Sequence, residues 1–330
     1  MGITYNDIYD PEVLEKLIGA DYQNEARLVN SGLLSREGLP SAGSQIQWLK
    51  QTLFSTDDEG QTIGVGSEIS LKNKVQEDYA APLVWRADGA ELDDVSEEVM
   101  AKLKAEGAEA TMANAISAKA AQMVDSVGVK IIDGSAQYLI SETSNYNNAN
   151  GSQVNLVDLE ETKSKRGEKG VNFAGGYMVM RGLMYHKLAS LGLVAATSNT
   201  MGNMAQNEIV RGGLKGTVLD MNIFVTDKIA NETGGDYYIH FLEAGALRMR
   251  LGGGVNIDPV LRAHRAFTSS IKFRLSMAGI VDGLSWGSAK SNPANVTNTA
   301  LATGTNYEQA ATYIKNVPMC VARFDAPSFA

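Results

Sequence analysis

Cysteine and histidine are scarce in this chain. Its 330 residues include one cysteine, Cys320, and three scattered histidines, His186, His240 and His264. A single cysteine excludes an internal disulfide framework and any metal site built from several thiolates. The histidines form no His-x-x-His or His-Glu-x-x-His pattern, so we expect them to be core or surface residues. Cys320 stands between apolar neighbours and is expected to be a buried small hydrophobe.

Long hydrophobic runs are also missing. The most apolar charge-free stretch, Leu188–Ala196, is far shorter than the roughly 20 residues that a membrane span needs. The first residues have neither a basic region nor an apolar core, so no signal peptide is expected. These features predict a protein without a membrane partner that is made and assembled in the cytoplasm.

Positive charge is in the minority. The chain has 29 basic and 38 acidic residues, a formal net charge of −9, which excludes a protein that coats nucleic acid over its whole surface. The triplet Gly252–Gly254 lacks the Lys-Ser/Thr of a phosphate-binding loop, and no Gly-x-Ser-x-Gly elbow occurs. The acids Asp93, Asp94, Glu97 and Glu98 are expected to lie at the start of a helix and complement its dipole. We therefore predict no catalytic residue, no cofactor and no metal.

Short strands and helices alternate without a regular βαβ order. Apolar patterns predict strands at 177–180, 219–225, 237–242, 246–251 and 271–277. Helices are predicted at 158–169 and 184–191, and a long helix at 92–128 restarts near Gly107. This mixture favours an α+β fold over a doubly wound sheet.

The first ninety residues have few apolar side chains. Residues 1–42 are expected to form an arm, with a helical piece at Glu25–Leu34 and a loop from Arg36 to Gly43, that must lie on another surface. Residues 44–88 are expected to form a long β-hairpin, because Ile69, Leu71 and Val75 alternate with polar residues. An isolated hairpin is marginally stable in water, so it needs a partner or folds back on its own domain.

Opposite charges are concentrated in two places. The predicted hairpin tip carries Asp57, Asp58 and Glu59. A later stretch of 27 positions carries a group of basic residues: Arg248, Arg250, Arg262, His264, Arg265, Lys272 and Arg274. On the predicted strand 271–277, Lys272 and Arg274 should lie on the opposite face from the apolar residues. Either these cations pair with acids of their own chain, or they form a surface for an acidic partner such as a neighbour's hairpin tip or packaged nucleic acid.

The order of these segments resembles the major capsid proteins of tailed bacteriophages, which have the Hong Kong 97 capsid fold. The segments that carry the resemblance are Gly176–Leu188, Gly216–Asp227, Tyr238–Phe241 followed by Glu243–Leu247, Gly283–Gly287, Asn292–Asn295 and Thr305–Glu308. Each segment alone is weakly specific, and their order covers nearly the whole chain.

The resemblance implies a division of the chain. Residues 1–42 would be an N-terminal arm and 43–92 an extended hairpin, the E-loop. Residues 93–133 and 231–277 would form a peripheral domain with a long spine helix, and 134–230 with 278–330 an axial domain. Some relatives crosslink a hairpin lysine, for which Lys72 and Lys74 are the candidates, but no partner asparagine is identified and no crosslink is predicted.

The family function is a shell subunit of the virion that assembles into hexamers and pentamers around double-stranded DNA. The resemblance also implies a portal, a separate scaffolding protein and a possible decoration protein as partners. Expected inter-subunit contacts come from both charged regions and from the apolar stripe of the hairpin: Trp48, Asp57, Asp58, Glu59, Ile69, Leu71, Lys72, Lys74, Arg248, Arg250, Arg262 and Arg265.

Two alternatives remain open at this stage. An encapsulin-like nanocompartment shell has the same fold and would package protein cargo. An α/β enzyme with an active site assembled from scattered residues would leave no motif in the sequence.

Overall fold

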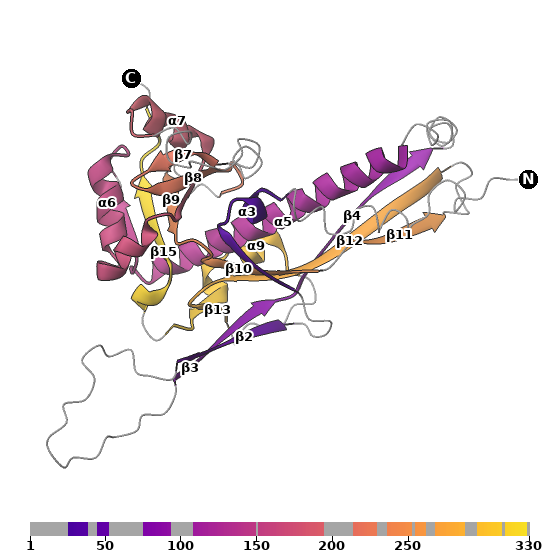
Figure 1. Ribbon diagram of the computed structural model, residues 1–330, viewed down its shortest axis with the longest axis horizontal. Coiled ribbons are helices and arrows are strands. Elements are labelled where there is room, and N and C mark those ends of the chain that lie inside the picture. Colours follow the sequence, from indigo (N-terminus) through magenta and orange to yellow (C-terminus); the bar gives the residue numbers. More distant parts are fainter. Residues whose placement is uncertain are drawn as a thin grey trace, which may run out of the picture.

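The computed structural model describes residues 26–38, 45–52, 75–93, 108–149, 151–194, 214–229, 236–252, 255–261, 268–287, 296–311 and 314–328. These residues form two main β-sheets joined by the long helix α5 (Ala108–Ser141), and a separate two-stranded hairpin (Figure 1). The six-stranded sheet lies at one end of the molecule, and the five-stranded sheet extends beside α5 toward the other end (Figure 1).

The six-stranded sheet has the strand order β5-β15-β9-β6-β8-β7. The β5–β15 and β6–β8 pairs are parallel, and the other pairs are antiparallel. Helices α6 (Leu156–Ser164) and α7 (Gly182–Ser190) pack on one face with the 3₁₀ helix η3 (Gly167–Phe173). Its strands are β5 (Tyr146–Ala149), β6 (Tyr177–Met180), β7 (Leu214–Val218), β8 (Met221–Val225), β9 (Tyr237–Leu242) and β15 (Met319–Phe324).

In the five-stranded sheet, the long strand β12 is the common partner. One edge of β12 pairs with β4, and the other edge pairs with β10 and β11. Strand β1 adds to β10 in parallel. The five strands are β1 (Leu34–Gly38), β4 (Val84–Asp93), β10 (Leu247–Leu251), β11 (Asn256–Leu261) and β12 (Thr268–Val281).

Helix α5 begins at Ala108, directly after the predicted interruption at Gly107, and continues to Ser141, beyond the predicted end at residue 128. Its 34 residues would span about 51 Å at the usual rise of about 1.5 Å per residue. The helix continues through Gly128 and Gly134, where added Cβ atoms would stand 2.5 Å from a Leu28 methyl and 2.1 Å from the Leu301 carbonyl oxygen. These glycines therefore allow close packing of neighbouring segments and do not end the helix. No helix in the described ranges has the length and hydropathy to cross a bilayer.

The segment before the hairpin differs from the expected arm. Within the described residues 26–38, the expected helical piece is the single turn α3 (Arg27–Asn30), and residues 34–38 are strand β1 and not a loop. Gly32 adopts a φ of +77°, which turns the chain out of the helix, and the edge of β10 then supplies hydrogen-bonding partners for β1. This part of residues 1–42 therefore packs on its own subunit.

A hairpin is confirmed between β2 (Gln45–Thr52) and β3 (Val75–Pro82), whose register runs from Gln45–Pro82 to Thr52–Val75. In Figure 1 the hairpin points away from both sheets. The expected hairpin ran to residue 88, but the chain leaves it after Pro82 and enters β4 of the five-stranded sheet. Asp93, expected at a helix start, is the last residue of β4 and lies opposite Thr268.

Strand assignments elsewhere mostly agree with the sequence patterns. The strands predicted at 177–180, 237–242, 246–251 and 271–277 are present as β6, β9, β10 and β12. The strand predicted at 219–225 is present as β8, which begins two residues later because Leu219 and Asp220 adopt positive φ in the turn that joins it to β7. Strand β9, expected with the peripheral strands, pairs with β15 and β6, because its uniformly buried residues need cover on both faces.

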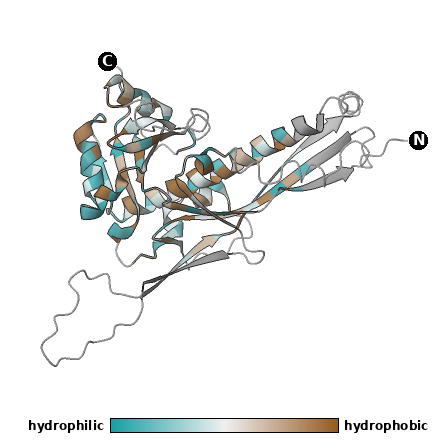
Figure 2. Ribbon diagram, in the orientation of Figure 1, coloured by the Kyte–Doolittle hydropathy of each residue, from teal (hydrophilic) through white to brown (hydrophobic). Residues whose placement is uncertain are grey.

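The remaining described elements form a small layer beside α5. Strands β13 (Leu284–Trp286) and β14 (Tyr307–Gln309) pair with each other, and α9 (Asn298–Leu301) precedes the 3₁₀ helices η5 (Gly304–Asn306) and η6 (Ile314–Asn316). Apolar residues concentrate on α5 and on the sheet surfaces that it covers (Figure 2). A second apolar cluster lies between the six-stranded sheet and α6, η3 and α7.

Candidate functional site

The predicted contact residues fall on two described elements. Trp48 lies in β2 at the position opposite Tyr79 of β3, and Arg248 and Arg250 lie in β10. The others lie outside the described residues: Asp57, Asp58, Glu59, Ile69, Leu71, Lys72, Lys74, Arg262 and Arg265. The structure therefore places Arg248 and Arg250 close together on β10. The contact between the acidic hairpin tip and the basic residues of a neighbouring copy remains a prediction.

A cationic face lies on the five-stranded sheet. Lys272 and Arg274 of β12 are exposed, while Phe273 between them is buried. In the antiparallel register, Arg248 and Arg250 lie opposite even-numbered residues of β12, so all four cations share one face. The register also places two acidic residues on this face, Asp258 opposite Lys272 and Glu37 opposite Arg250. We use the term cationic face for Arg248, Arg250, Lys272 and Arg274.

One residue of the cationic face already has an acidic partner in its own chain. Arg248 Nη2 lies 3.3 Å from a carboxylate oxygen of Asp282, and both side chains are partly exposed. Lys272 and Arg274 lie farther along β12, where their side chains reach solvent. The structure therefore shows that Arg248 pairs with an acid of its own chain, while a contact of Lys272 and Arg274 with an acidic partner remains a prediction.

Trp85 is a candidate contact that the sequence analysis did not single out. It lies in β4 opposite Ser276 of β12, on the same face as the cations, and is 46% exposed. The alternation of buried Val84 with exposed Trp85 is the signal that could have identified it. Exposed tryptophan and arginine are the side chains most enriched at protein–protein contacts.

Exposed apolar side chains also occur on the layer that covers the six-stranded sheet. Val157 of α6 and Val171 of η3 are each 75% exposed. Smaller exposed fractions occur at the start of α6 and on α7, at Leu156, Leu183 and Leu191. Helices α6 and α7 lie at the end of the molecule that carries the six-stranded sheet, away from β12 (Figure 1).

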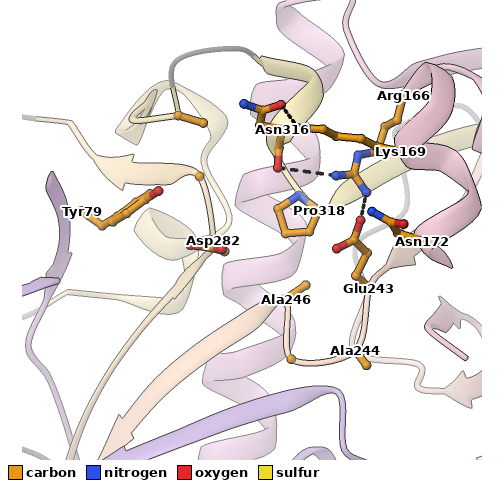
Figure 3. Close-up of a pocket in the computed structure, with 13 residues that line it drawn as sticks. Tyr79, Arg166, Lys169, Asn172, Glu243, Ala244, Ala246, Asp282, Asn316 and Pro318 are labelled. Atoms are coloured by element: carbon orange, nitrogen blue, oxygen red, sulfur yellow. Dashed lines mark hydrogen bonds and ion pairs between the residues drawn. The ribbon is translucent and has the colours of Figure 1, made fainter. Parts of the chain in front are cut away.

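A polar pocket of about 350 Å³ lies where the two sheets and the base of the hairpin meet (Figure 3). Arg166 forms an ion pair with Glu243, and Lys169 donates a hydrogen bond to the Asn316 side chain. Tyr79 and Asp282 lie on the opposite side of the pocket (Figure 3). The Arg166–Glu243 pair and the Lys169–Asn316 hydrogen bond therefore join separate segments on one side of the pocket.

The titratable core residues are inert near neutral pH. Burial, with a smaller effect of Lys130, lowers the pKa of His240 to about 3. Burial raises the pKa of Cys320 to about 12, so the thiol stays protonated, which agrees with the buried hydrophobe predicted from the sequence. Within the described ranges, no cluster of three or more His, Cys, Asp or Glu side chains could hold a metal ion.

Among known proteins, similarity is found to solved structures and not to sequences. No protein-family model matches the sequence, and no curated protein matches it. Among solved structures, the chain is similar to the capsid protein of Ralstonia phage GP4, with a TM-score of 0.59 and 10% identity over 91% of this chain and 89% of that chain. It is also similar to the mature capsid subunit of bacteriophage PhiM1, with a TM-score of 0.50 and 8% identity over 89% and 86%.

The similarity extends over nearly the full length of both chains. An identity of 10% establishes a shared fold and nothing finer. The chain therefore has the fold of tailed-phage capsid proteins, which confirms the predicted α+β chain with the Hong Kong 97 capsid fold.

Proposed function

We propose that this chain is the major capsid protein of a tailed bacteriophage, a structural subunit with no enzymatic activity. The observation that carries the proposal is the full-length match to the capsid of Ralstonia phage GP4. A match over 91% of this chain and 89% of the capsid chain is hard to reconcile with an enzyme that shares only one domain.

The subunit would assemble into hexamers and pentamers of an icosahedral shell that encloses double-stranded DNA. The elongated shape supports this role. The hairpin packs on its own body through β3, where Tyr79 and Ala81 are buried, and it points away from both sheets, which leaves surface for a second copy (Figure 1). Head-to-tail contacts between identical copies close into rings when the rotation between them is regular. In the proposed division, residues 1–42 form an arm, 43–92 the hairpin region, 93–133 with most of 231–277 the peripheral domain, and 134–230 with 278–330 the axial domain.

The cationic face is the surface that we assign to a neighbouring copy. Its exposed cations and Trp85 would receive the acidic hairpin tip formed by Asp57, Asp58 and Glu59 of the next subunit. Electrostatic complementarity of this kind fixes the register of a contact and speeds its formation more than it raises affinity. Portal, scaffolding and decoration proteins would be further partners in the virion, and the DNA would be enclosed without sequence-specific contacts.

Electron microscopy and native mass spectrometry of the purified protein test the proposal. We expect uniform spherical shells, and in dissociated samples five- and six-fold multiples of the 35.3 kDa subunit mass. Shells that copurify with a protein cargo would favour a nanocompartment. A protein that stays monomeric or dimeric, alone and when produced together with the phage's scaffolding protein, would contradict the proposal.

A further inference from the structure

The chain crosses directly between the two main sheets at one short turn. Residues 243–246 leave β9 and enter β10, the Ala246 amide donates to the Glu243 carbonyl at 3.1 Å, and Gly245 has a φ of +71°. These features define a type II turn, which requires a residue that tolerates positive φ at its third position. The Glu243 amide also donates to the Pro318 carbonyl at 3.1 Å, so the turn is attached to the segment that leads into β15.

Arg166 binds this turn from the body of the six-stranded sheet. Its side chain is 2% exposed and forms an ion pair with the Glu243 carboxylate. Its Nε donates to the Lys315 carbonyl at 3.0 Å, and its guanidinium lies 5.1 Å from the ring centroid of Phe173. One side chain therefore connects the turn to η3 and η6 (Figure 3).

The polar pocket lies immediately beside this ion pair. Across it stand Tyr79 at the base of the hairpin and Asp282 at the end of β12, which belong to the parts of the molecule beyond the turn. Apolar packing holds both flanks of the turn, since Leu242, Ala246 and Leu247 are buried in the core that contains α5. On the side of the pocket, where close packing is interrupted, directional contacts to Glu243 hold the turn.

We propose that Arg166 is a positioning residue that fixes the orientation of the five-stranded sheet relative to the six-stranded sheet through Glu243. A second step rests on the proposed capsid function: the orientation of the two sheets within each subunit contributes to the curvature of the shell. Burying a charged pair costs desolvation energy and is a poor source of stability, but it can specify one arrangement among several.

Arginine suits this role better than lysine. Its planar guanidinium donates to the carboxylate and to a backbone carbonyl at the same time, whereas an ammonium is a single point charge on a flexible stem. R166K therefore keeps the charge and loses the fixed geometry. E243Q removes the charge of the partner and serves as an independent second variant.

The orientation of the sheets can be measured in the unassembled subunit. Nitroxide labels at A87C on β4 and A189C on α7, both exposed positions, report the distance between the two parts by pulsed electron resonance. Cys320 is buried and stays unlabelled in the folded subunit. We expect the distance distribution to broaden or shift in R166K and E243Q.

D236N is the matched control. It breaks the ion pair between Asp236 and Arg323, which belongs to the same sheet but does not touch the turn, and it should leave the distance distribution unchanged. Circular dichroism first establishes that each variant is folded, and a variant that is not folded is replaced by the other one. Distributions in R166K and E243Q that are as narrow as in the wild type, at the same distance, would overturn the proposal.

Assembly tests the second step separately. We expect R166K and E243Q shells to lose their uniform diameter in electron micrographs, while D236N shells stay uniform. Uniform shells of wild-type diameter from both variants would refute the link to curvature. If the wild-type protein forms no shells, the proposed function fails, and the label distances still decide the role of Arg166.

Discussion

His240 is a core residue whose protonation is governed by burial. It is 2% exposed, and its ring stacks on Tyr238 with centroids 6.4 Å apart. Because burial lowers its pKa to about 3 from the usual 6.5, the unfolded chain binds a proton below pH 6.5 that the folded chain excludes. The folded state is therefore disfavoured as the pH falls through this window.

We expect the free energy of unfolding to decrease as the pH falls from 6.5 toward about 3. This residue contributes a slope of up to about 1.4 kcal/mol per pH unit. Urea denaturation above and below pH 6.5 measures the slope. H240Q should have a shallower slope, whereas H186Q, which changes an exposed histidine of α7, should behave as the wild type. Equal slopes in H240Q and the wild type would contradict the assignment.

Gly134 shows how close packing selects a residue that helix propensity disfavours. A Cβ there would stand 2.1 Å from the Leu301 carbonyl oxygen and 2.4 Å from the Tyr307 ring. We expect G134A to lower the free energy of unfolding by about 1–3 kcal/mol through overpacking, although alanine favours helix by about 1 kcal/mol.

Thermal or urea denaturation measures this effect, and G128A is the matched control. At Gly128 the nearest atom is the end of the Leu28 side chain, which can rotate away, so a smaller loss is expected. A G134A protein as stable as the wild type would show that the contact with Leu301 is easily relaxed.

At the scale of elements, α3 and β1 are held to the subunit by one buried carboxylate. Asp125 of α5 accepts hydrogen bonds from the backbone amides of Leu28 at 3.0 Å and Arg27 at 3.2 Å. These amides begin a helix of four residues that has no side-chain cap of its own. Arg27 also donates to the Val225 carbonyl at 3.2 Å, which links this segment to the six-stranded sheet.

D125A should loosen this segment. Two amides lose their acceptor, so we expect faster hydrogen exchange in residues 26–38 and a loss of stability of about 1–2 kcal/mol, the usual effect of removing a helix cap. D88A, which removes an exposed ion pair with Lys119, should leave exchange in this segment unchanged. Unchanged exchange in D125A would show that β1 is held by its pairing with β10 alone.

At the scale of the whole molecule, charge is distributed unevenly. The chain carries a net charge of −9, yet four cations share one face of the five-stranded sheet. The proposed contact joins the exposed Lys272 and Arg274 of this face to the acidic hairpin tip of a second copy.

A charge exchange tests this contact. K272E with R274E should leave the subunit folded, because both side chains are exposed, and should prevent shell formation in sedimentation experiments. The conservative pair K272R with R274K keeps the charge and should assemble. Adding D57K and D58K to the K272E/R274E protein should restore part of the assembly, and normal assembly of K272E/R274E itself would exclude the contact.

Local patterns in the sequence determined most of the strands and the class of the fold. The alternation of Lys272 and Arg274 with buried Phe273 identified β12, and the apolar run at Tyr177–Met180 identified β6. The order of such segments was sufficient to indicate the capsid fold. Strands can be predicted in this way because a strand with one buried face alternates apolar and polar residues along the chain.

Only the tertiary structure decided how these elements combine. Strand β9 lies between β15 and β6, α5 continues through Gly128 and Gly134, and Arg166 meets Glu243 although 77 positions separate them in the chain. Each of these outcomes depends on contacts between residues distant in sequence. Such contacts have no periodicity along the chain, so the sequence by itself does not reveal them.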